Sequence, residues 1–224
     1  SIPKPLLPVG ERPILQIIIE QLRDAGIRDI VLATGYQAEL IHAFCGDGSR
    51  FGVNVTYVHE ETPLGTAGPL ALVRDRVQPG DLIVLMNGDI LTKLDFTQFV
   101  DRARRSDCDL MVGYTTHVYK SPFGVLQIEN ELVTGVVEKP TQQYSISAGI
   151  YCVKSTGVAH VPDGRFFTVP DLIHALLAAG KSIGTYHIAE CWIGLESIQH
   201  FEEALKELNN APLPGGAPGN AAGR

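Results

Sequence analysis

Segments with helical and with strand-like patterning alternate along most of this 224-residue chain, and this alternation restricts the fold more than any other feature. Apolar residues recur at helical spacing over 13–25, and Gly26 ends the run. A strand is expected at 29–33, a helix at 37–44 and a second strand at 53–58. This order predicts a βαβ unit and a parallel sheet.

A second group of elements follows in the middle of the chain. Residues 81–86 are nearly all apolar, which is typical of a central parallel strand that is covered on both faces. Asp95, with Gln98 three residues later, predicts a capping box for a helix that runs to Arg104. The next strand is expected at 110–114.

Closely spaced strands replace this alternation after residue 123. Strand-like runs at 124–128, 132–138 and 146–153 leave no room for helices between them, and Asn130 suits a tight turn between the first two. This part is therefore expected to be antiparallel.

The last third of the chain returns to helices. Thr168 is expected to cap a helix at 170–179, which is followed by a strand at 182–187 and an amphipathic helix at 196–208. Residues 211–224 are rich in Pro and Gly and predict a flexible tail or linker.

Composition and charge exclude several classes of function. The net charge of −7 and the absence of a basic block argue against nucleic acid binding. No apolar stretch approaches the roughly 20 residues of a membrane helix. The four cysteines are scattered without ligand spacing, which argues against zinc and favours a reducing cytoplasm.

Two loops carry residues typical of a nucleotide site. Residues 64–68 read Leu-Gly-Thr-Ala-Gly, a glycine turn that would let the backbone approach a planar ligand. Asp89 ends the run Asn-Gly-Asp directly after an apolar strand, where a carboxylate could hold Mg²⁺ beside phosphate oxygens. From Gly-Asp alone, an ordinary turn aspartate is an equal interpretation.

Six motifs in order resemble the sugar-1-phosphate nucleotidyltransferase family, and most closely its mannose-1-phosphate guanylyltransferase-like branch. They are Pro3–Pro8, Leu64–Leu70, Asn87–Asp89, Phe123–Val125, Val137–Pro140 and Ser147–Tyr151. The similarity extends nearly to Leu208. Each motif alone is weak, but their common order is specific.

The resemblance implies an α/β fold of the Rossmann-like, three-layer nucleotidyltransferase (GT-A-like) type, with a mixed central sheet and a small antiparallel sugar-binding part. We expect one such domain over 1–210. It implies that a sugar 1-phosphate attacks the α-phosphorus of a nucleoside triphosphate and releases pyrophosphate, with Mg²⁺ as cofactor. The residues that match the family's site are Asp89 (metal and catalysis), Lys4 and Lys139 (catalysis), Glu60, Gly65, Thr66 and Gly88 (nucleotide), and Gly124, Glu138, Lys139, Ser147 and Gly149 (sugar).

The base and the sugar are less specified. Glu60 stands where uridylyl- and thymidylyltransferase relatives have Gln, and a carboxylate suits the adjacent N1–H and amino donors of guanine, which favours GTP. Many relatives have Asn where this chain has Ser147, which leaves the sugar open. The alternatives are the same reaction with UTP or dTTP, or a regulatory domain that binds nucleotide sugars without catalysis.

The chain departs from the family pattern in two places. The family's glycine-rich phosphate loop would precede Ser1, and relatives usually have an aspartate, the second Mg²⁺ ligand, shortly after the tryptophan that matches Trp192. We expect that flexible or removed pieces of a normal enzyme account for both. Some relatives continue into a further domain after the segment that matches Leu208, and relatives commonly pair, which leaves a homo-oligomer open.

Overall fold

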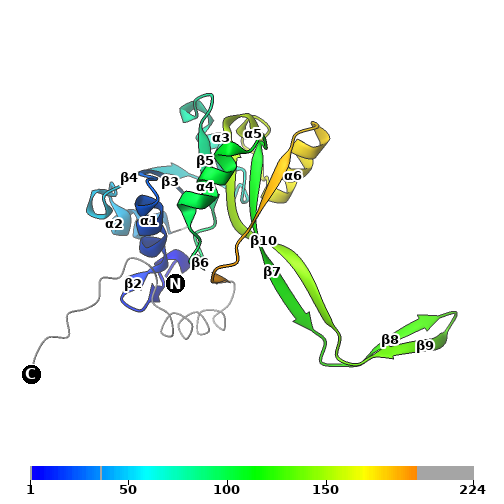
Figure 1. Ribbon diagram of the computed structural model, residues 1–224. Helices are drawn as coiled ribbons and strands as arrows, with labels where there is room; N and C mark the ends of the chain where they lie inside the picture. Colours follow the sequence, from blue (N-terminus) through cyan, green and yellow to red (C-terminus); the bar gives the residue numbers. More distant parts are fainter. Residues whose placement is uncertain (1, 36, 196–224) are drawn as a thin grey trace, which may run out of the picture.

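The computed structural model describes residues 2–35 and 37–195 (Figure 1). Its central four-stranded sheet has the order β11-β7-β10-β5, where β11 is Ile183–His187, β7 is Leu110–Lys120, β10 is Thr141–Lys154 and β5 is Leu82–Met86. β11 pairs with β7 in parallel, whereas β10 is antiparallel to both β7 and β5. The expected α/β fold with a mixed central sheet is confirmed.

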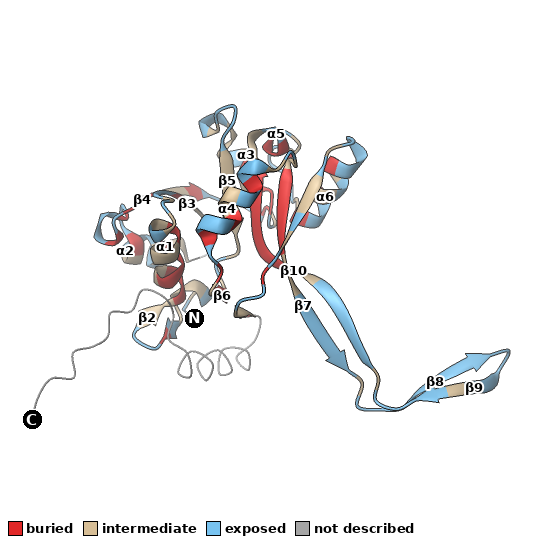
Figure 2. Cartoon of the chain, viewed as in Figure 1, coloured by how far each residue is buried: buried red, intermediate tan, exposed pale blue. Residues whose placement is uncertain are grey.

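Helices cover both faces of this sheet and make three layers. α1 (Ile14–Asp24) and α4 (Phe96–Arg105) pack in one apolar core with alternate sheet residues such as Met111 and Cys152. A second core lies on the opposite face of the sheet. It is formed by the sheet side chains that alternate with those of the first core and by residues of α3 (Pro69–Leu72), α5 (Ser155–Val158) and α6 (Val169–Ala178). Figure 2 shows the buried residues gathered on the sheet and the inner sides of these helices. Because successive side chains of a strand point to opposite faces of the sheet, each strand contributes residues to both cores.

The first αβ segment folds as expected. β3 (Asp29–Thr34), α2 (Ala38–Cys45) and β4 (Asn54–His59) form a βαβ unit, and the two strands pair in parallel with Asp29 opposite Asn54. Because the strands are parallel, their carboxyl ends lie at the same edge, where ligands bind in α/β folds.

The prediction for β5 was half wrong. The strand forms, but it lies at one end of the sheet and pairs antiparallel with β10. Its apolar character is explained by the two cores, because Ile83 and Leu85 contact one and Val84 and Met86 contact the other. A continuous apolar run indicates that a strand is buried on both faces, but it does not indicate whether the neighbouring strand is parallel or antiparallel.

The two predicted helix caps differ in detail. The Asp95 carboxylate accepts from the Gln98 main-chain amide at 3.0 Å, but the Gln98 side chain donates back to the same carboxylate, so half of a capping box forms. At Thr168 the box is complete, because Thr168 Oγ1 accepts from the Asp171 amide and Asp171 accepts from the Thr168 amide.

β7 and β10 continue past the sheet into an extension that leaves the body of the molecule (Figure 1). They lead to an antiparallel hairpin of β8 (Val125–Glu129) and β9 (Leu132–Val137), which confirms the antiparallel part. Asn130 and Glu131 both have positive φ, as a two-residue type I′ turn requires. We call residues 116–145 the arm. The prediction missed the outer parts of β7 and β10 because they are exposed and mostly polar, without a regular alternation of apolar residues.

Short elements complete the described chain. They are η1 (Lys4–Leu6), β1 (Pro8–Val9), β2 (Arg12–Pro13), η2 (Ser49–Phe51), η3 (Arg74–Arg76), β6 (Ile90–Thr92) and β12 (Trp192–Gly194). β12 pairs antiparallel with β6. The helix expected at 196–208 and the tail at 211–224 lie outside the described residues. Within 2–35 and 37–195, no helix is both long and apolar enough to cross a membrane.

Candidate active site

The loop that carries Asp89 joins β5 to β6 and is held by its main chain. The Asn87 amide donates to the Gly149 carbonyl at 3.0 Å, and the Asp89 carbonyl accepts from the Leu195 amide at 2.9 Å. The Asp89 side chain is half-buried, and it makes no hydrogen bond or ion pair with other residues that the structure describes. The backbone thus fixes this carboxylate and leaves its oxygens available to a ligand.

A bulge in β10 packs against that loop. Ser147 lies opposite Tyr114 and Tyr151 opposite Val112, so that residues 148–150 face a single residue of β7. Gly149, in the bulge, has a φ of +67°, and a Cβ there would lie 2.8 Å from Asn87 Nδ2. Bulges of this kind often redirect a strand beside a functional site.

Two hydrogen bonds hold the bulge. Ser147 Oγ lies 2.7 Å from the Tyr151 hydroxyl, and the Trp192 indole donates to the Ala148 carbonyl at 2.8 Å. Burial raises the pKa of Tyr151, and the hydrogen bond with Ser147 opposes part of that shift. Tyr151 therefore stays protonated near neutral pH.

The turn around Lys4 lies on the other side of the loop. Pro3 and Pro5 flank Lys4 in η1, and a Cβ on Gly88 would approach Pro5 Cγ to 3.3 Å. Lys4 is exposed and directly precedes Pro5 in the chain. The structure thus places Pro5, the residue after Lys4, against Gly88, and Gly149 against Asn87.

The glycine turn at 64–68 packs against the segment that leads into α6. A Cβ on Gly65, whose φ is +79°, would lie 2.8 Å from the Phe167 carbonyl oxygen, which accepts from the amides of Ala67 and Gly68. The Thr66 hydroxyl accepts from the Val169 amide at 2.9 Å, at the first residue of α6. The turn thereby connects the start of α3 to the start of α6. The sequence motif did not predict this structural role.

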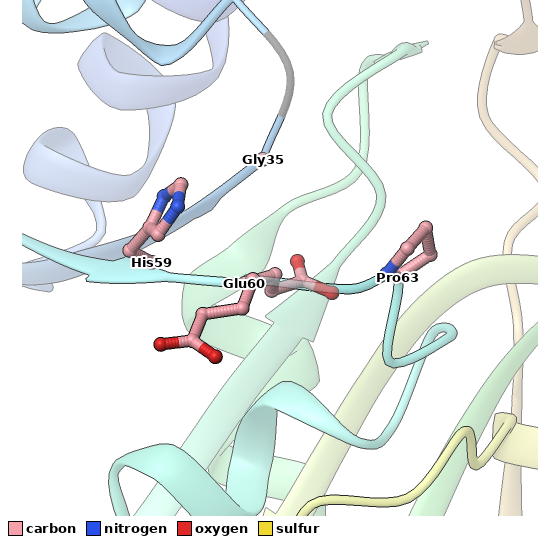
Figure 3. Close-up of a pocket in the computed structure, with 5 residues that line it drawn as sticks. Gly35, His59, Glu60 and Pro63 are labelled. Carbon is pink, nitrogen blue, oxygen red and sulfur yellow. The ribbon is translucent and has the colours of Figure 1, made fainter.

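A cavity of about 440 Å³ opens at the carboxyl ends of β3 and β4 and is lined by Gly35, His59, Glu60, Glu61 and Pro63. Figure 3 shows Gly35 after one strand, His59 at the end of the other with Glu60 just after it, and Pro63 beyond them. Glu60 Oε2 accepts from the Leu64 amide at 2.8 Å, which ties this carboxylate to the start of the glycine turn.

The remaining matched residues lie at the base of the β8–β9 hairpin. A Cβ on Gly124 would approach Glu138 Oε2 to 3.1 Å, so these two residues are adjacent. Lys139 has a φ of +45°, which is unusual for a residue with a side chain. The hairpin extends away from β6 in Figure 1, so the structure does not bring Glu138 and Lys139 together with Asp89.

Sequence reasoning assigned no role to two residues that shape the site, Tyr151 and Phe167. Phe167 makes its contacts through its main chain, which no side-chain pattern can signal. Trp192 packs partly in the core and also holds the bulge.

The donor set restricts which metal could bind. Among the described residues, no three His, Cys, Asp or Glu side chains gather as a metal-binding group. A single carboxylate does not form an all-protein cage. It does suit Mg²⁺, which takes its other ligands from phosphate oxygens and water.

Comparisons with known proteins show what this chain is similar to. A family model described as nucleotidyl transferase matches residues 1–192. The mannose-1-phosphate guanylyltransferase of Mycobacterium tuberculosis is 32% identical and covers 96% of this chain and 61% of that protein. The UTP–glucose-1-phosphate uridylyltransferase of Synechocystis is 26% identical over the same shares of both chains. The chain thus spans about three fifths of the length of these curated relatives.

Solved structures share the fold. The crystal structure of HddC from Yersinia pseudotuberculosis aligns with a TM-score of 0.71 at 22% identity, over 92% of this chain and 90% of that one. HddC complexed with GMP-PN aligns with a TM-score of 0.68, also at 22% identity, over 93% and 91%.

Proposed function

Because this chain belongs to the nucleotidyl transferase family, we propose that it transfers GMP from GTP to a sugar 1-phosphate and releases pyrophosphate. We propose mannose 1-phosphate as the acceptor, since the relative from Mycobacterium tuberculosis is a mannose-1-phosphate guanylyltransferase. The observation that carries this proposal is the meeting of the Lys4 turn, the Asp89 loop and the Gly149 bulge at one place.

The reaction needs no covalent enzyme intermediate. A phosphate oxygen of the sugar phosphate, already ionised at neutral pH, forms a bond to the α-phosphorus of GTP. The bond from that phosphorus to the bridging oxygen of pyrophosphate breaks, and pyrophosphate leaves with the electron pair. Catalysis therefore depends on alignment and on neutralising charge rather than on a nucleophilic side chain.

Three charged residues would supply that neutralisation. Asp89 would hold Mg²⁺, whose charge offsets that of the phosphates when it is bound. Lys4 would pair with the triphosphate, and Lys139 with the attacking sugar phosphate. Asp89 would act as a metal ligand rather than as a general base.

The cavity at the ends of β3 and β4 supports a nucleobase site. Glu60 Oε2 is engaged by the Leu64 amide, and Oε1 would accept from the N1–H and amino group of guanine. Gly65, Thr66 and Gly88 would border the nucleotide through their main chains. The uridylyltransferase relative from Synechocystis favours UTP as the second candidate.

The sugar would lie between the bulge and the base of the hairpin. Ser147 and Gly149 would face it from β10, and Gly124 and Glu138 from the arm. Because the hairpin points away from β6 in Figure 1, these roles require that the arm bend toward the Asp89 loop when substrates bind.

The experiment is to measure pyrophosphate release by the full-length protein with each nucleoside triphosphate and a panel of hexose 1-phosphates. We expect the highest kcat/KM with GTP and mannose 1-phosphate. Faster turnover with UTP or dTTP would overturn the base assignment. Tight nucleotide-sugar binding without turnover would replace the enzyme by a regulatory domain.

We also propose a cytoplasmic location. Cys45, Cys108 and Cys152 carry free thiols, as is usual for proteins of reducing compartments.

A further inference from the structure

His59 lines the cavity at the ends of β3 and β4 with an imidazole that has no polar partner in the described chain. The residue is exposed, and its side chain makes no hydrogen bond, ion pair or ring contact with other residues that the structure describes. His42 differs, because its ring lies 3.8 Å from that of Tyr57 and its Nε2 lies 3.5 Å from Thr34 Oγ1. Both ring nitrogens of His59 are therefore available to a ligand.

His59 and Glu60 reach this cavity from opposite sides of the chain. His59 is the last residue of β4 and pairs with Thr34, the last residue of β3. The ladder continues for one more step, because the Glu60 amide donates to the Thr34 carbonyl at 2.9 Å. Consecutive side chains of an extended strand point to opposite faces, so an imidazole and a carboxylate flank the end of β4. Figure 3 shows the His59 ring on the side of the strand where Gly35 lies.

The charge of the cavity determines which part of a nucleotide it can hold. Glu60 and Glu61 both line it, and none of its five lining residues is a lysine or an arginine. A triphosphate would be repelled by these two carboxylates, whereas an uncharged base would not. The cavity therefore suits a nucleobase whose phosphates lie outside it.

Guanine carries its donors and acceptors in an order that matches these two side chains. Along one continuous edge it presents its amino group and N1–H, which donate, and then O6 and N7, which accept. Glu60 is held by the Leu64 amide through Oε2, which leaves Oε1 to accept from the donor end of that edge. His59 is the only side chain among the described lining residues that can donate an N–H to the acceptor end.

We propose that His59 donates a hydrogen bond to N7 of guanine and thereby helps to select the base. This assignment rests on the proposed function, since it takes GTP as the nucleotide. Uracil and thymine have no atom that corresponds to N7, and adenine presents an amino donor beside N7 where guanine has O6. A carboxylate alone would also accept from the ring N–H of uracil, so the two side chains together discriminate guanine better than Glu60 does.

The test is the equilibrium binding of nucleotides to the full-length protein, measured by calorimetry with Mg²⁺ and without sugar phosphate. 7-Deaza-GTP differs from GTP only by a C–H group in place of N7. We expect the wild-type protein to bind GTP about tenfold more tightly than 7-deaza-GTP, which is the effect of one hydrogen bond. His59→Phe keeps a flat ring without a donor, and this variant should bind the two nucleotides equally.

The controls separate the two ends of the base. His117→Phe removes another exposed histidine, which lies on the arm, and it should keep the tenfold preference. His59→Gln retains an N–H donor and should recover part of the preference. ITP lacks the amino group that Glu60 would bind, so it should bind more weakly than GTP both to the wild-type protein and to His59→Phe.

Equal binding of GTP and 7-deaza-GTP by the wild-type protein would overturn the role of His59, and so would a preference that survives in His59→Phe. In both cases turnover with GTP would leave the proposed function in place. Tighter binding of UTP than of GTP would instead overturn the base assignment, and the role of His59 with it.

Discussion

Gly149 is fitted against Asn87 so closely that a Cβ on Gly149 would lie 2.8 Å from Asn87 Nδ2. Its φ of +67° adds backbone strain for any other residue. We therefore expect Gly149→Ala to lower the free energy of unfolding by about 3 kcal/mol, from strain and overpacking together. Urea denaturation measures this value.

Gly180 provides a matched control for that variant. It has a φ of +69°, but no atom lies within 4 Å of a Cβ built there. Gly180→Ala should cost only the backbone strain, about 1–2 kcal/mol. Equal losses in the two variants would mean that the bulge has room for a side chain.

Asp89 should matter for turnover and not for stability. Asp89→Asn keeps the shape of the side chain, and the wild-type carboxylate has no hydrogen bond or ion pair with the described residues that could be lost. We expect kcat to fall by about 100-fold or more, since the cation would lose its protein ligand. Initial rates and thermal unfolding, with exposed Asp107→Asn as the control, distinguish this from misfolding. Unchanged turnover would remove Asp89 from the mechanism.

Thr66 should matter for stability. Its hydroxyl accepts from the Val169 amide, and Thr66→Val would leave that donor without its partner. The expected loss is about 1–2 kcal/mol in urea denaturation. Thr66→Ser keeps the hydroxyl and should retain most of the stability. If serine and valine behave alike, the hydrogen bond does not contribute.

The buried thiols should make the protein less stable at high pH. Burial raises the pKa of Cys45 from 9.0 to about 11 and that of Cys152 from 9.0 to about 12. As the pH rises above about 9, the unfolded chain loses these protons before the folded protein does. The free energy of unfolding should therefore fall, by up to about 1.4 kcal/mol per pH unit for each thiol.

Denaturation between pH 7 and 11 checks this slope. Cys152→Ala should flatten it, because it removes the buried thiol whose pKa is raised. A thiol reagent gives an independent readout, because Cys45 and Cys152 should react only after unfolding. Rapid labelling of all four cysteines in the folded protein would contradict the assignment.

Local signals predicted much of this fold. The Thr168 cap, the βαβ unit and the Asn130 turn were all foreseen, because each depends on neighbouring residues and on a short-range period. The direction of β5 was not, because it depends on β10, more than 50 residues away in the chain.

The candidate site divides in the same way. Motif order selected Lys4, Asp89 and Gly149, and the segments that carry them contact one another through Pro5 and Gly88 and through Asn87 and Gly149. The Phe167 main-chain contacts with the glycine turn could not be foreseen, because main-chain contacts leave no trace in residue type. The catalytic and binding roles assigned to all these residues stay predictions.

The bulge at 148–150 separates β10 into an inner and an outer half, each with its own register against β7. Between Ser147 and Tyr151 β10 advances by four residues, while β7 advances by two, from Tyr114 to Val112. Because both numbers are even, a side chain that points to one face of the sheet in the outer half has its counterpart on the same face in the inner half. Insertions or deletions in the outer half leave the inner half in place. The hairpin can therefore change length among homologous chains without disturbing the packed interior.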